Sequence, residues 1–296
     1  MKSTQIKIEG FAYQPDPWDK ASVGVYGIES TGKTRLACTM PHDDGVIGVV
    51  GLDKKNLRTF KQEAKAIGVP YVAKDKPYIS DKDLARLAML TDESDYGKGS
   101  QKNQELIEEK QNELKRFYKV LTDQVYEDLH NLVRSDQVES VVVDTASQFY
   151  QWLQYKHFGR TNKIPAMSRE VFNQDMVDFI NLTRSKNALF INRAKEVWKK
   201  VGTLSNGDDK KEPTGIFEPD GFKGIGAHLT VYVELISNKL KALERGDKEE
   251  EARKKFRCKV YRCQTNALLE GLDLGDYGVC GEDITWDNLM VAIGFE

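Results

Sequence analysis

The chain has 296 residues, which is enough for one large domain or two small ones, and its 40% apolar and 30% charged side chains are typical of a globular protein with a strongly charged surface. A formal net charge of −2 excludes nucleic-acid binding through overall charge, so such binding would need local basic patches. No apolar run is long enough to span a membrane and no signal peptide follows Met1, so we expect a cytoplasmic protein without a membrane partner.

The first strong motif lies between a β-branched run, Val23–Tyr26, and residues that can open a helix. It has the pattern Gly-x-x-x-x-Gly-Lys-Thr of a phosphate-binding P-loop. Its glycines let backbone N–H groups point at one anion, and the helix N-terminus adds a positive dipole end. Lys33 would reach the β- and γ-phosphates, and the Thr34 hydroxyl would bind Mg²⁺. The sequence therefore predicts an ATP site formed by Gly27, Glu29, Ser30, Thr31, Gly32, Lys33, Thr34 and Arg35.

Two later apolar runs end in acidic residues. The first, Val46–Val50, is followed by Gly51-Leu52-Asp53, and the second, Val138–Asp144, ends in Asp144 itself. Continuous apolar runs suit parallel strands buried on both faces, whose carboxyl ends carry the ligand sites of open α/β sheets. We expect Asp144 to be the second acidic element of a P-loop NTPase, which holds Mg²⁺ through a bound water.

Four elements are predicted between these strands and one region remains irregular. Helices are expected over Asn56–Ile67 and Asp81–Leu90, a short strand over Tyr71–Ala73, and a loop over residues 92–103. An apolar stripe at helical spacing predicts a long helix from about Gln104 to Arg134. This helix could pack on the sheet or form a coiled coil with a partner, and both readings stay open.

Beyond Asp144 the pattern becomes more polar. Residues 151–169 interleave aromatic and basic side chains, which suits either single-stranded nucleic acid or an ordinary solvated surface. A helix is expected over Glu170–Arg184, a buried strand over Ala188–Arg193, and a long functional or mobile loop over residues 199–224. The chain then predicts a strand pair, Leu229–Ile236 and Phe256–Arg262, and a final helix with Asp283 or Thr285 at its start.

The cysteines do not suggest a metal site. Cys258 and Cys263 are five positions apart in an expected strand, so they should point to opposite faces. No Cys-x-x-Cys or His-x-x-x-His pair completes a zinc site, and we expect reduced, structural thiols.

The order of these elements resembles the RecA-like ATPase core, and the closest resemblance is to phage-encoded RecA-like P-loop ATPases of the single-strand-annealing and recombination type. Three segments carry it: Gly27–Thr34, Val141–Thr145 and Leu189–Arg193. The resemblance predicts an α/β P-loop NTPase with a RecA-like, mostly parallel central sheet flanked by helices and a C-terminal β-hairpin. Residues 1–296 would form a single domain, with a core of about 20–295, a helical insertion at about 92–135 and a charged hairpin extension at about 237–256.

The resemblance also implies catalytic roles. In this family a carboxylate after the second strand, commonly a glutamate, polarises the attacking water, and Asp53 is the acid at that place. Asn192 or Arg193 occupies the position of the polar group that senses the γ-phosphate, and Lys33 binds that phosphate. Lys223 is the candidate for the basic residue that a neighbouring subunit contributes.

DNA contacts in such proteins come from loops after the third and fourth core strands, which correspond to residues 155–167 and 199–224. The implied partners are single-stranded DNA, further copies of the chain in a ring or filament, and a single-strand DNA-binding protein, in the host-cell cytoplasm if the protein is phage-encoded. A helicase- or packaging-type motor ATPase, and a nucleotide-gated assembly protein with little hydrolysis, are the alternative functions. The candidate DNA-binding residues are Tyr155, Lys156, Phe158, Arg160, Lys163, Lys199 and Lys200.

Overall fold

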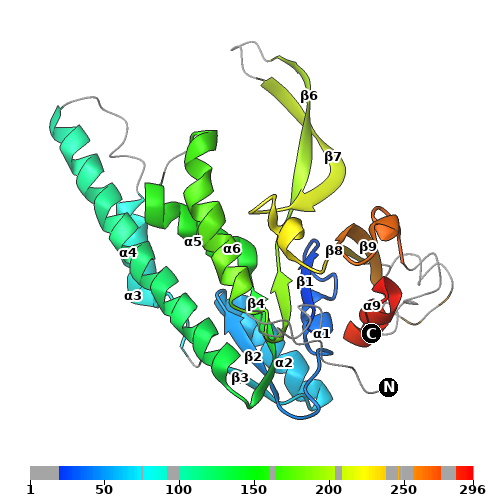
Figure 1. Ribbon diagram of the computed structural model, residues 1–296. Coiled ribbons are helices and arrows are strands. Elements are labelled where there is room, and N and C mark those ends of the chain that lie inside the picture. The colour runs from blue at the N-terminus through cyan, green and yellow to red at the C-terminus, as the bar shows by residue number, and fades with distance from the viewer. Residues whose placement is uncertain are drawn as a thin grey trace, which may run out of the picture.

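The architecture is a seven-stranded sheet covered by helices on both faces (Figure 1). The computed structural model describes residues 20–74, 76–91, 101–160, 164–203, 209–237, 246, 248, 256–274 and 285–295. The strand order is β3-β2-β4-β5-β1-β8-β9, and every neighbouring pair is parallel except the last, β8 with β9. The strands are β1 Ser22–Tyr26, β2 Val46–Gly51, β3 Tyr71–Ala73, β4 Val138–Asp144, β5 Asn187–Ile191, β8 Val231–Ser237 and β9 Phe256–Cys263.

Two hydrophobic cores lie on opposite faces of this sheet. One is formed with α1, α2 and α9, and the other with α3, α4, α5 and α6. The expected α/β class is confirmed, with a mostly parallel sheet flanked by helices and a final antiparallel strand pair. The helices are α1 Lys33–Ala37, α2 Lys54–Ile67, α3 Asp81–Leu90, α4 Gln101–Arg134, α5 Ala146–Phe158, α6 Glu170–Asn181 and α9 Trp286–Ile293, with short 3₁₀ turns at Ala166–Arg169, Ile225–His228 and Ala267–Leu269.

Alternation along the strands explains why both faces are apolar. In β4, Val142 packs into the α1–α2–α9 core, whereas Val141 and Val143 pack into the core of the other face. In β5, Leu189 packs into the α1–α2–α9 core and Phe190 packs into the core of the other face. Successive side chains of a strand point to opposite faces, so a central parallel strand must be apolar throughout. This is why the sequence pattern located these strands.

The long helix and the final helix agree with the sequence. The stripe of α4 that includes Leu114, Leu121 and Leu129 is buried against the sheet layer, which supports packing rather than a coiled coil. Helix α9 is capped by Thr285, whose hydroxyl accepts a hydrogen bond from the Asn288 amide at 3.2 Å. None of the helices in the described ranges combines the length and apolarity that crossing a membrane requires.

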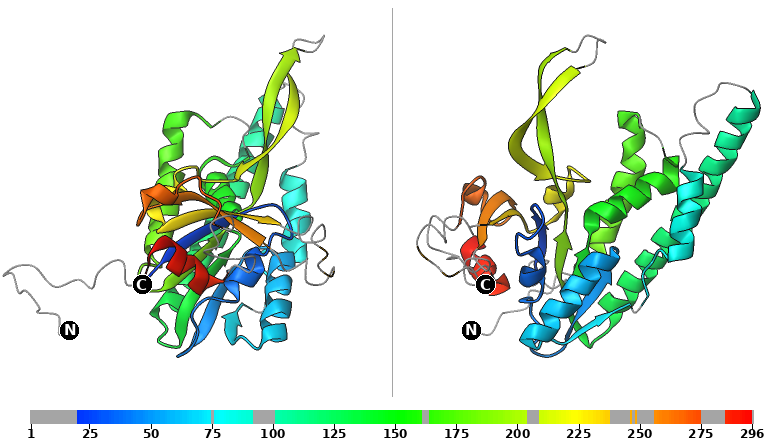
Figure 2. Two further views of the ribbon diagram at one scale, coloured as in Figure 1. Left: turned by 90° about the vertical axis from the view of Figure 1, so that its right-hand side faces the viewer. Right: turned by 180° about the vertical axis from the view of Figure 1, so that it is seen from behind.

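The long loop expected over residues 199–224 is wrong. Most of it belongs to an antiparallel ribbon, β6 Ala194–Thr203 and β7 Asp209–Pro219, that extends away from the sheet (Figure 2). Cross-strand ion pairs bridge it, Lys195 with Glu218 at 3.4 Å and Lys200 with Asp209 at 2.5 Å. Register shifts between paired residues accommodate glycines and a proline that suggested a loop.

The expected placement of the two cysteines is also wrong, because Cys258 and Cys263 are both buried in the same core. The register of β9 against β8 shifts between Tyr232 and Val233, which inserts Tyr261 as an extra residue. A β-bulge reverses the side-chain alternation beyond it, so a spacing of five returns to the same face.

Some expectations fall outside the described residues. These are residues 92–100 of the loop expected at 92–103, Lys163, Cys280, Asp283 and most of the charged extension at about 237–256. Residues 101–103 of that expected loop belong to α4 instead, because the helix begins at Gln101. The assignment of residues 1–296 to one domain stays a prediction.

Candidate nucleotide-binding site

The P-loop motif forms a turn between β1 and α1, as its sequence predicts. Ser30 and Gly32 have left-handed backbone conformations, with φ of 61° and 83°. Gly27 is required for close packing, because a Cβ there would lie 2.5 Å from the carbonyl oxygen of Leu235 and 2.6 Å from Oγ1 of Thr31. The segment from residue 28 to residue 30 is exposed, so the outer side of the turn is open to a ligand.

Lys33 folds back over this turn. Its Nζ donates hydrogen bonds to the carbonyl oxygens of Gly27 at 2.7 Å and Ile28 at 2.6 Å. Burial lowers the pKa of the Lys33 ammonium to about 8, and the charges of Asp144 and Glu29 act in the opposite direction. A cation desolvated in this way gains when an anion replaces its lost hydration.

Asp144 lies at the end of β4 and is only 3% exposed. Burial raises the pKa of its carboxyl to about 6, while a hydrogen bond from Asn56 and the charge of Lys33 favour ionisation. The Asn56 amide donates to Oδ1 of Asp144 at 3.0 Å. Asp144 and Lys33 therefore act on each other electrostatically, which places the acidic strand end and the P-loop in one site.

Asp53 follows β2 and is engaged twice. It is the N-cap of α2, where Oδ1 accepts a hydrogen bond from the Lys55 amide at 2.8 Å. Its Oδ2 accepts a second one from the guanidinium of Arg193 at 3.2 Å. The structure thus brings together two residues that the resemblance assigned to different roles, and it gives the carboxylate a cationic partner.

Asn192 and Arg193 follow β5, which lies between β1 and β4. The Asn192 side chain is 2% exposed, and its amide donates to the Phe190 carbonyl at 3.4 Å. The backbone N–H of Arg193 donates to Oγ of Ser147 at 3.1 Å. Arg193 is therefore anchored to the start of α5 and reaches across to Asp53.

The remaining P-loop candidates surround the turn. Thr31 is buried, and its hydroxyl donates to the Ile28 carbonyl at 2.9 Å. Glu29 is exposed and pairs with Lys55 at 3.4 Å. Thr34 and Arg35 lie half-buried in the first turn of α1.

The donor set fits Mg²⁺. The Thr34 hydroxyl and the Asp144 carboxylate supply oxygen, which this ion prefers, and Mg²⁺ usually takes one or two protein ligands together with waters and substrate phosphates. Within the described ranges, no three His, Cys, Asp or Glu side chains are grouped to hold a metal ion.

The candidate DNA residues near α5 have partners within the protein. Tyr155 and Phe158 belong to the helix rather than to a loop, and their rings contact Tyr118 at 4.9 Å and Phe172 at 6.0 Å between centroids. Lys156 pairs with Asp175 at 2.8 Å. The loop expected at 155–167 is wrong over residues 155–158, because these rings complete the packing of α5 against α4 and α6.

The other candidate basic residues are more exposed. The Arg160 guanidinium donates to the Thr91 carbonyl at 2.7 Å, and Lys199 and Lys200 lie on the ribbon. Lys223 is exposed and lies 3.9 Å from Glu218. Contacts of these residues with DNA or with a second subunit stay predictions.

No protein-family model matches the chain, and no curated protein matches it either. The resemblance to RecA-like ATPases therefore rests on the residues themselves. Sequence reasoning missed Asn56 and Ser147, which position Asp144 and Arg193. Asn56 had a signal, since it falls in the first turn of a helix that starts at the end of β2.

Proposed function

We propose that the chain is a RecA-like ATPase that binds and hydrolyses ATP with Mg²⁺, binds single-stranded DNA and promotes annealing or recombination, as phage-encoded proteins of this type do. The observation that carries the proposal is the mutual electrostatic influence of Lys33 in the P-loop and Asp144 at the end of β4. A half-buried ammonium and a buried carboxylate at the carboxyl edge of a parallel sheet suit a nucleotide phosphate and a metal ion.

Each residue has a role in this proposal. Lys33 leaves the carbonyls of the P-loop and pairs with the β- and γ-phosphates. Asn56 fixes the Asp144 carboxylate, which would help to hold Mg²⁺. Mg²⁺, when bound, neutralises phosphate charge. Asp53 orients the attacking water once Arg193 has moved from it.

A second candidate function, a nucleotide-gated assembly protein with little hydrolysis, is favoured by the state of Asp53. Its two oxygens are engaged by the α2 N-terminus and by Arg193. A carboxylate whose two oxygens are engaged in this way is not directed at an attacking water. Comparing the binding of ATP with its turnover distinguishes the two functions.

Calorimetry with a non-hydrolysable ATP analogue and Mg²⁺ tests the nucleotide site. We expect Lys33→Ala to abolish high-affinity binding, because the cation aimed at the phosphates is removed. Lys65→Ala is the charge-matched control, since Lys65 lies exposed in the last turn of α2. Equal affinity of the parent and Lys33→Ala would overturn the proposal.

The DNA and assembly parts of the proposal need separate measurements. ATPase rates with and without single-stranded DNA test stimulation, and light scattering with nucleotide and DNA tests assembly into a ring or filament. Strand displacement would instead favour the motor ATPase. Annealing rates with and without a single-strand DNA-binding protein test that partner.

A further inference from the structure

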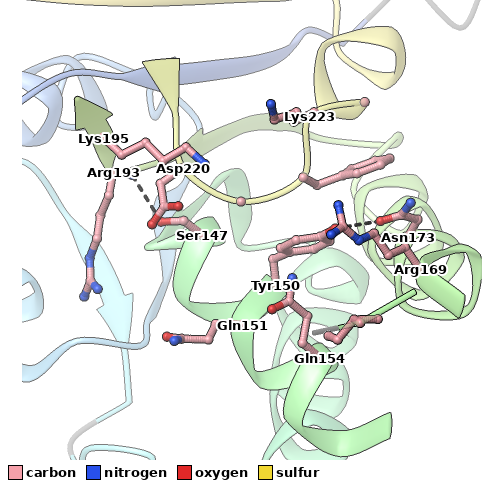
Figure 3. Close-up of a pocket in the computed structure, with 14 residues that line it drawn as sticks. Ser147, Tyr150, Gln151, Gln154, Arg169, Asn173, Arg193, Lys195, Asp220 and Lys223 are labelled. Carbon is pink, nitrogen blue, oxygen red and sulfur yellow. Dashed lines mark hydrogen bonds between the residues drawn. The ribbon is translucent and has the colours of Figure 1, made fainter. Parts of the chain in front are cut away.

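A polar pocket of about 440 Å³ lies next to the candidate nucleotide site (Figure 3). It is bounded by α5, by the start of α6, and by the first residues of β6 and the turn after β7. The P-loop does not line it, but Arg193 does. The polar side chains of its lining include Gln154, Arg169, Asn173, Lys195 and Lys223.

The lining is strongly cationic. It includes four basic residues, Arg169, Arg193, Lys195 and Lys223, and one acidic residue, Asp220. The two lysines share one further carboxylate, because Glu218 lies 3.4 Å from Lys195 and 3.9 Å from Lys223. One carboxylate neutralises at most one of them, and no ion pair joins Arg169 to another residue of the described ranges. The pocket therefore has excess positive charge to offer an anion.

Neutral donors lie among these cations, and the pocket wall is held in place. The Tyr150 hydroxyl donates to Oδ1 of Asn173 at 2.7 Å, which leaves the amide N–H groups of Asn173 for a ligand. The Tyr150 ring stacks on Phe222 at 5.8 Å between centroids, and Phe222 stacks on His228 at 6.0 Å. This three-ring stack fixes the turn that carries Lys223.

Arg193 joins the pocket to Asp53. Its backbone is fixed on the pocket side, where its N–H donates to Ser147 and its carbonyl accepts from the Asp220 amide at 2.8 Å. Its guanidinium lies 3.2 Å from the Asp53 carboxylate. Figure 3 shows this side chain directed away from the other basic residues of the pocket. To contact an anion in the pocket, this guanidinium would have to turn away from Asp53.

We propose that this pocket binds a backbone phosphate of single-stranded DNA and that Arg193 couples its occupation to the nucleotide site. Arg169 and the side-chain amides of Asn173 and Gln154 line the same pocket. Such a set of donors matches a phosphodiester, whose oxygens accept several hydrogen bonds at once. The inference rests on the proposed function and deepens it. It moves the DNA contacts from Tyr155, Lys156 and Phe158, which are packed or paired, to the pocket.

The binding test uses fluorescent oligothymidine with the full-length parent, Arg169→Ala, Lys195→Ala and the double variant. Arg116→Ala is the control, because Arg116 is an exposed arginine on α4, outside the pocket. We expect the double variant to bind at least about tenfold more weakly. Its log–log salt dependence should be shallower by about 0.7, the contribution of the one phosphate that the pocket would bind.

Two results would overturn the pocket assignment. One is a double variant with the affinity and salt slope of the parent. The other is competition by polyglutamate as strong as that by unlabelled oligothymidine, which would identify an acidic protein segment as the occupant. Arg169→Glu gives a second, stronger perturbation at an exposed position that does not threaten folding.

The coupling test compares oligothymidine affinity with and without a non-hydrolysable ATP analogue. We expect a ratio of about fivefold or more in the parent and a ratio near one in Arg193→Ala. By linkage the parent should show the same ratio when analogue affinity is measured with and without DNA. An unchanged ratio in Arg193→Ala overturns the coupling. If the parent does not bind the ATP analogue, the proposed function is wrong as well. If the parent binds the analogue but substitutions in the pocket do not change DNA affinity, only the pocket assignment is wrong.

Discussion

Lys33→Met should change how the stability of the nucleotide-free protein depends on pH. Burial lowers the pKa of Lys33 to about 8, against 10.5 for the ordinary side chain. Below pH 8 both the folded and the unfolded chain hold the proton, so the folded state bears the full cost of burying the charge. Between pH 8 and 10.5 the folded state has lost the proton and the unfolded state still holds it. The free energy of unfolding therefore rises with pH across this window.

The magnitude follows from the two pKa values. They differ by about 2.5 units, and each unit is worth about 1.36 kcal/mol, so the full effect is about 3.4 kcal/mol. Between pH 7 and pH 10, a two-state titration with these values recovers about 2.5 kcal/mol of it. Methionine has a similar length and no charge. Loss of the three hydrogen bonds of Lys33 to the P-loop shifts the stability of the variant by a constant amount at every pH.

Urea unfolding of the parent and Lys33→Met at pH 7, 8, 9 and 10, without nucleotide, measures this difference. We expect the stability of the parent to rise relative to that of the variant by about 2.5 kcal/mol over the series. Tyrosines that titrate in the same range are common to both proteins and cancel. Lys65→Met, at an exposed position, should show no such trend. Parallel curves for the parent and Lys33→Met would refute the argument that the P-loop ammonium is desolvated.

Three further predictions concern the same site. Burial raises the pKa of the Asp144 carboxyl to about 6 from 3.8, so the free energy of unfolding falls as pH rises from 3.8 to 6 and the buried group ionises. Asp144→Asn cannot ionise, so it should have a higher melting temperature than the parent at pH 7. Calorimetry should nevertheless show that the variant binds ATP more weakly in the presence of Mg²⁺. Asp53→Asn should keep the melting temperature, because asparagine is an equally good N-cap, while the steady-state ATPase rate falls. Gly27→Ala should lose about 1–3 kcal/mol in urea unfolding, since its Cβ would lie 2.5 Å from the Leu235 carbonyl, whereas Glu29→Ala should not.

The sequence predicted the central strands and the edge where the site lies. Runs such as Val46–Val50 and Val141–Val143 have no polar side chain. A strand that is buried on both faces has this pattern, whereas a strand with one exposed face alternates between apolar and polar residues. The P-loop glycines and the acidic residues come directly after such strands. Ligands bind at the carboxyl edge of parallel strands, so these residues indicate where the site lies. These features are local in the sequence, and so they can be read without a structure.

Features that depend on pairing between distant residues could not be read in this way. The ribbon β6–β7 contains glycines and prolines that are typical of loops, and only the cross-strand register and its ion pairs make it a ribbon. The bulge at Tyr261 likewise depends on how β9 aligns with β8. Arg169 and Lys195 line one pocket only because the turn before α6 and the first residues of β6 both lie beside α5.

The pairing of Asp53 with Arg193 has the largest consequence for function. The sequence placed both residues at one edge of the sheet, but it could not show that the arginine already holds the carboxylate. In this arrangement both oxygens of Asp53 already accept hydrogen bonds, from the Lys55 amide and from Arg193, so neither is directed at a water. Under the proposed function, turnover requires another anion to draw Arg193 away. A γ-phosphate on one side and a DNA phosphate on the other are the two anions that can do so, and hydrolysis should be fastest when both are bound.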